Sequence, residues 1–118
     1  MATESTLTIY RSSDHSVRVD VVTEDGGVTP QTMTGWALAF VVRLGSSLVL
    51  SKATSGGGIT IGNGSGTDDR ATVAIADTDT AGWTAGRDYS WALWRTDDGS
   101  DTPLAYGPCR IVYVAAQP

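Results

Sequence analysis

The chain has 118 residues, of which 41% are hydrophobic and 18% are charged, so it suits one globular domain rather than two. Thirteen acidic residues outweigh eight basic ones, and the formal net charge is −5. Without a run of Lys or Arg, this balance argues against nucleic acid as a partner. The longest apolar run, residues 36–42, is too short to span a bilayer, so we expect no membrane partner. Residues 1–8 have neither a basic start nor an apolar stretch, so we expect no signal peptide.

Apolar side chains alternate with polar or small ones along most of the chain, which is the period of a β-strand. Segments rich in Gly, Asp, Asn and Ser, which favour turns, separate these runs. In chain order, we expect strands at residues 6–11, 16–23, 35–44, 47–53, 58–61, 70–76, 87–96 and 104–114. One helical turn is expected at residues 77–83, with Asp77 or Asp79 as its cap.

These elements define the expected architecture. About seven to eight short antiparallel strands at this spacing predict an all-β fold, either a sandwich or a barrel. No linker or internal repeat divides the chain, so we expect a single domain over residues 1–118. A short flexible arm, residues 1–6, would precede its first strand.

Two parts of the chain carry residues that often bind ions. The glycine-rich stretch 56–66 lacks the lysine of a phosphate loop and precedes a strand, so we predict a hairpin loop. The acidic run 96–101 does not have the alternate spacing of a calcium loop, and no glutamate follows it. We interpret this run, and likewise Asp68 with Asp69, as solvated turns.

A further group of carboxylates, Asp77, Asp79 and Asp88, lies beside aromatic residues, as in sugar-cleaving sites. A glycosidase needs two carboxyl groups that face each other across the sugar, whereas here turn closure and exposure account for all three. The one histidine, His15, and the one cysteine, Cys109, share no motif, and a free cysteine is usually a buried small hydrophobe. We therefore predict that the chain is not an enzyme, and expect no catalytic residue, cofactor or metal ion.

The aromatic residues divide into two groups by their phase. Trp36, Tyr89 and Trp91 fall on the apolar phase of their strands and are predicted to pack in the core. Trp94 is out of phase with Tyr89 and Trp91, so its side chain is expected on the opposite, outer face. Trp83 lies in the turn before that strand, and we favour a plug at one end of the fold over a ligand contact. An aromatic residue left on the surface indicates an interface, because its burial there stabilises binding.

The order of the motifs is itself informative. The segments are MTGWALAFVVR at 33–43, LVLSKAT at 48–54, GGGITI at 56–61, RATVAIADTDTAGWTAGRDYSWALWRTDDG at 70–99 and PLAYGPCRIVYV at 103–114. This order resembles the immunoglobulin-like β-sandwich module of tailed-phage virion structural proteins, such as the N-terminal module of upper baseplate proteins. The resemblance covers residues 7–114. It implies a single immunoglobulin-like β-sandwich that serves as a structural part of a virion.

Three functions follow as expectations. Because no long helix or fibre domain follows the expected sandwich, the first is an accessory binding module, such as a capsid decoration or cement protein. The second is a tail, neck or baseplate/fibre adaptor, and the third is a carbohydrate-binding module with a platform of Trp83, Trp94 and Tyr106.

The first two functions share the same partners and location. The partners would be other virion proteins, namely the major capsid protein or tail and baseplate components, and further copies in a homo-oligomer. The protein would be assembled into the virion in the host cytoplasm. Trp94, Trp83 and Tyr106 are the predicted partner-binding residues.

Overall fold

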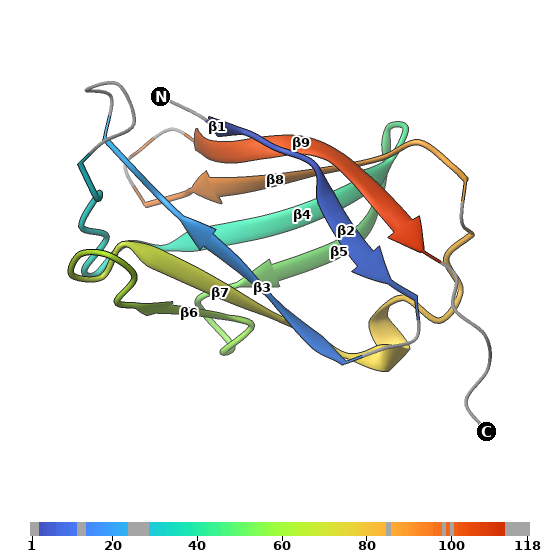
Figure 1. The fold of residues 1–118 in the computed structure, drawn as a ribbon, viewed down its shortest axis with the longest axis horizontal. Helices are drawn as coiled ribbons and strands as arrows, with labels where there is room; N and C mark the ends of the chain where they lie inside the picture. Colours follow the sequence, from blue (N-terminus) through green and yellow to red (C-terminus); the bar gives the residue numbers. More distant parts are fainter. Residues whose placement is uncertain are drawn as a thin grey trace.

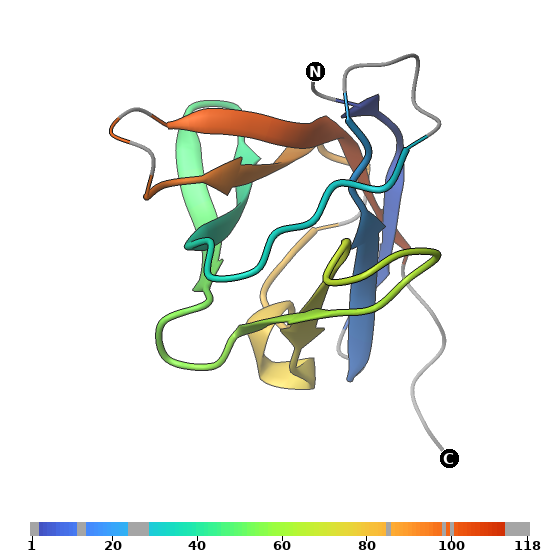
Figure 2. The ribbon, with the colours of Figure 1, turned by 90° about the vertical axis from the view of Figure 1, so that its left-hand side faces the viewer.

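The computed structural model describes residues 3–11, 14–23, 29–84, 86–97, 99 and 101–112. Two β-sheets pack against each other as a sandwich, seen in two perpendicular views in Figures 1 and 2. The strands are β1 (Thr3–Glu4), β2 (Leu7–Tyr10), β3 (His15–Asp20), β4 (Leu38–Leu44), β5 (Ser47–Ala53), β6 (Ile59–Gly62), β7 (Arg70–Ile75), β8 (Tyr89–Arg95) and β9 (Thr102–Val112). The predicted all-β sandwich is therefore confirmed.

The six-stranded sheet has the order β1-β9-β8-β4-β5, with β2 also paired to β9, and the three-stranded sheet has the order β3-β7-β6. A sheet of β9, β8, β4 and β5 that faces a sheet of β3, β7 and β6 is the immunoglobulin-like arrangement. Two details differ from the expectation. The described residues form nine strands, and β1 and β2 run parallel to β9 rather than antiparallel.

The core lies between the sheets and follows the alternation in the sequence. On β4, for example, Leu38, Phe40 and Val42 are buried while the residues between them are not. The buried hydrophobic residues from both sheets and their connections form one cluster, in which Tyr89 and Trp91 lie as predicted. Cys109 is also buried there, at 3% exposure.

The N-terminal segment, predicted as a flexible arm over residues 1–6, lies along β9 from Thr3 onward. The Ser5 amide donates to the carbonyl oxygen of Tyr106 (2.9 Å), and the indole Nε1 of Trp91 donates to the Ser5 carbonyl oxygen (3.0 Å). Gly107 permits this approach, because a Cβ atom at that position would collide with the Ser5 carbonyl oxygen. The segment thereby covers an edge of β9 that would otherwise be open.

The loop before β7 is organised by a carboxylate, which corrects one prediction. Asp69 is not in a solvated turn, because its exposure is only 1%. It accepts hydrogen bonds from the amides of Gly64 (2.6 Å) and Gly66 (3.2 Å) and from the Ser65 hydroxyl (3.4 Å). These donors, Gly64 foremost, lower the pKa of the Asp69 carboxyl below its usual value. In this loop the Asp69 carboxylate accepts amide hydrogen bonds of the kind that carbonyl oxygens of a neighbouring strand accept within a sheet.

The expected helical turn is the short 3₁₀ segment η1 (Asp77–Asp79), which ends earlier than the predicted residue 83. The N-cap position is Ala76, so neither expected aspartate occupies it, but Asp79 stabilises the start of the turn from its third position: its Oδ2 accepts from the Ala76 amide (2.8 Å) and pairs with Lys52 Nζ (2.9 Å). Asp77 instead donates its backbone amide to Asp14 Oδ1 (2.7 Å).

Candidate interaction surface

The outer face of the six-stranded sheet is the part of β9, β8, β4 and β5 that points away from the core. Register identifies its central residues, because cross-strand partners point to the same side of a sheet. Ala39 lies opposite Trp94, Val41 opposite Ala92, and Ala92 opposite Tyr106. The centre of the outer face is thus made of aromatic and small apolar side chains drawn from three neighbouring strands.

Trp94 occupies the place that its phase predicts. It is partly buried on the outer face, where it lines a hollow of about 240 Å³. The hollow is lined by Ala39, Val41, Arg43, Trp94, Thr96 and Asp101. Ala39 and Val41 have smaller side chains than the indole that lines the hollow with them, and the ring stays partly exposed.

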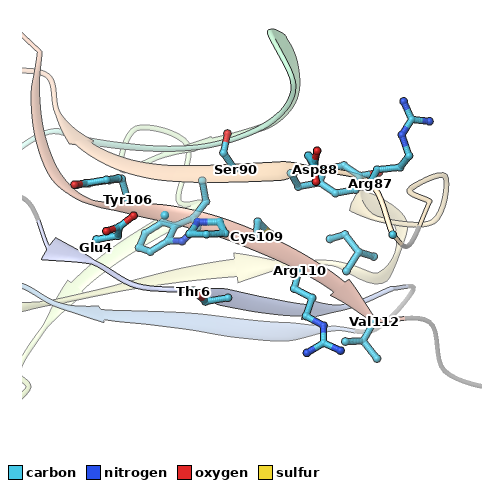
Figure 3. Close-up of a pocket in the computed structure, with 15 residues that line it drawn as sticks. Glu4, Thr6, Arg87, Asp88, Ser90, Tyr106, Cys109, Arg110 and Val112 are labelled. Carbon is cyan, nitrogen blue, oxygen red and sulfur yellow. The ribbon is translucent and has the colours of Figure 1, made fainter.

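Tyr106 lies next to Trp94's strand and is 42% exposed. It lines a larger open groove of about 1110 Å³ that runs over β8, β9 and the N-terminal segment. Figure 3 shows Glu4 beside Tyr106 at one end of the groove and Arg87 with Asp88 at the other. Cross-strand partners share a side, so Glu4, which pairs with Tyr106, belongs to the same surface.

Trp83 is in a different environment from the other two predicted partner-binding residues. It is 8% exposed and stacks on Tyr89, with ring centroids 5.3 Å apart. The Tyr89 hydroxyl accepts a hydrogen bond from the Thr84 amide (3.0 Å), which holds the turn against the ring pair. Trp83 therefore plugs one end of the sandwich, and the platform of three exposed rings that a carbohydrate-binding module would use is not formed.

A contact that the sequence did not reveal lies at the end of β8. The Arg95 guanidinium sits over the Trp36 ring, 3.8 Å from its centroid, and also pairs with Asp97 (2.9 Å). This ion pair lowers the pKa of Asp97, chiefly through the hydrogen bond from Arg95. Trp36 is only partly buried, because it precedes β4, which begins at Leu38. Trp36 and Arg95 are far apart in the sequence and share no motif, so the sequence alone gives no signal for this contact.

The candidate chemical groups do not converge on one site. Burial raises the pKa of the Cys109 thiol to about 12, so the thiol is not a nucleophile in the folded chain. Asp79 is engaged by Lys52, whereas Asp88 lines the groove over β9. Among the described residues, no three His, Cys, Asp or Glu side chains gather as metal ligands. Within the same residues, no helix has the length and apolar character needed to cross a membrane.

Comparison with known proteins adds no family to these observations. No protein-family model matches the chain, and no curated protein matches it either.

Proposed function

We propose that this chain is a non-enzymatic structural protein of a tailed-phage virion, an accessory binding module of the capsid decoration or cement kind. One observation carries the binding role: Trp94 and Tyr106 lie on neighbouring strands of one open sheet face, around the small residues Ala39 and Ala92. Aromatic rings on a rigid face are frequent anchors of protein interfaces. The virion context is supported by the resemblance of the sequence to virion β-sandwich modules.

The properties of the rest of the molecule agree with this role. A net charge of −5 favours solubility before assembly and disfavours non-specific attachment to the packaged genome. The groups that organise the loops, such as Asp69 and Asp79, are already hydrogen-bonded within the chain. They act on the fold and leave the outer face as the surface for partners.

An adaptor at the tail, neck or baseplate is the alternative that uses the same surface. Both functions require a rigid module that binds other virion proteins, and they differ only in where those proteins lie. A carbohydrate-binding role has two rings rather than three at its disposal, because Trp83 is buried.

The test is the composition and structure of purified particles. We expect the chain in gradient-purified virions by mass spectrometry, and cryo-electron microscopy should place it on the head at many copies. Density at the tail would support the adaptor alternative instead. Absence from purified virions would overturn the proposed function. In particles assembled with Trp94→Ala, occupancy should fall, whereas Arg18→Ala on the opposite sheet should leave it unchanged.

A further inference from the structure

Two opposite charges lie toward the two ends of the hollow on the outer face. Arg43 and Asp101 are both exposed and line the same hollow, with Val41 and Trp94 between its ends. Arg43 follows Ala39 by four positions on β4, which separates them by about 13 Å along the strand. Since Ala39 pairs with Trp94 at the end where Asp101 lies, the cation and the anion mark opposite ends of the face.

We propose that this face binds a second copy of the chain, with the two sheets stacked face to face and their strands antiparallel. The proposal rests on the proposed function only in taking the outer face as an interface. A two-fold axis that lies between the sheets and crosses the strands makes such an interface self-complementary. It sets Arg43 of each copy against Asp101 of the other, with Val41 of each copy near the axis and each Trp94 ring toward the end that carries Asp101.

The direction of the strands follows from the charges. Stacking with parallel strands would place Arg43 against Arg43 and Asp101 against Asp101, and like charges at an interface are unfavourable. Antiparallel stacking pairs opposite charges twice. Leu48, which lies opposite Arg43 on β5 and is 51% exposed, adds apolar surface at the basic end.

The size of the face sets the strength of the dimer. Four strands at about 4.8 Å spacing and seven residues at about 3.3 Å give roughly 19 by 23 Å, or about 440 Å² per copy. Two copies would cover about 900 Å², which is at the lower end of specific interfaces. We therefore expect a weak dimer, with dissociation in the micromolar to sub-millimolar range, that forms fully where copies are concentrated on a particle.

Sedimentation equilibrium of the purified full chain tests the proposal. We expect the mean mass to rise from one chain to two as concentration increases from about 10 μM to about 1 mM. Arg43→Asp and Asp101→Arg should each weaken the dimer by about tenfold, because each change turns two attractions into two repulsions. The double variant Arg43→Asp/Asp101→Arg should regain the dimer, and high salt should weaken the wild-type dimer.

Controls separate surface effects from folding. Arg18→Asp, exposed on β3 of the other sheet, should leave the dimer unchanged, and all variants should keep the wild-type unfolding midpoint. A chain that stays monomeric throughout the concentration range overturns the proposal, as does a double variant that fails to regain the dimer. Neither result affects the virion assignment, which depends on purified particles, and absence from virions leaves the dimer test intact.

Discussion

Gly107 is the glycine at which the fold least tolerates an added side chain. In Gly107→Ala, the new Cβ would meet the Ser5 carbonyl oxygen, so the N-terminal segment must move away from β9. We expect a loss of about 1–3 kcal/mol, the usual cost of overpacking, measured by chemical denaturation. Gly82→Ala is the matched control, since no atom lies near its added Cβ, and should change stability by less than about 0.5 kcal/mol. Equal effects of the two changes would contradict the proposed contact.

Asp69 makes the stability of the fold depend on pH. Its pKa is lowered in the folded chain by the Gly64 and Gly66 amides, so the carboxylate stabilises the fold above its unfolded pKa. This contribution is lost as pH falls from that value through the lower folded pKa. We expect Asp69→Asn to lower the thermal midpoint most at pH 7 and progressively less toward pH 3. A difference between variant and wild type that stays constant across this range would argue against the role of the charge.

At the scale of elements, Asp79 ties η1 to β5 through one carboxylate. It caps the turn at the Ala76 amide and pairs with Lys52, so Asp79→Ala removes both contacts. We expect a loss of about 1 kcal/mol by denaturation, typical of a lost cap, with little added by the partly exposed ion pair. Asp77→Ala is the control, because Asp77 contributes its backbone amide and not its carboxylate. If both substitutions have the same effect, the assignment of the cap to Asp79 is wrong.

Most strands could be predicted from sequence because their signal is local. The period of two and the intervening turns place all eight expected segments close to the observed strands β2 to β9. The pairing of β1 and β2 with β9 could not be predicted in this way. It depends on Gly107, which lies about a hundred positions after Ser5, and on Trp91, which lies 86 positions after Ser5. The burial of Asp69 was likewise hidden, since its amide donors lie in a loop whose conformation the sequence leaves open.

At the scale of the whole molecule, the residues of the candidate interaction surface could be identified only once the strands were placed in the sheet. The phase of Trp94 within its own strand predicts an outward side chain, and the structure confirms that orientation. Tyr106 lies on the same face because β9 pairs with β8. Trp83 does not lie on this face, because its ring stacks on Tyr89 at one end of the sandwich. The partner-binding role of Trp94 and Tyr106 stays a prediction, which the dimer and virion experiments address.

The sandwich as a whole can be followed through its single cysteine. Cys109 lies on β9 in the core, at 3% exposure, and burial raises the pKa of its thiol to about 12. Because alkylation requires the thiolate, the shift from the ordinary value of 9.0 alone should slow the reaction at pH 8 about a thousandfold. We expect iodoacetamide to label the native chain only through global opening, with labelling in about 6 M guanidinium as the reference. Substitutions that weaken the fold, such as Gly107→Ala, should speed native labelling, with the logarithm of the rate rising in proportion to the stability lost. Native labelling at the rate of the unfolded chain would show that β9 is not held in the core.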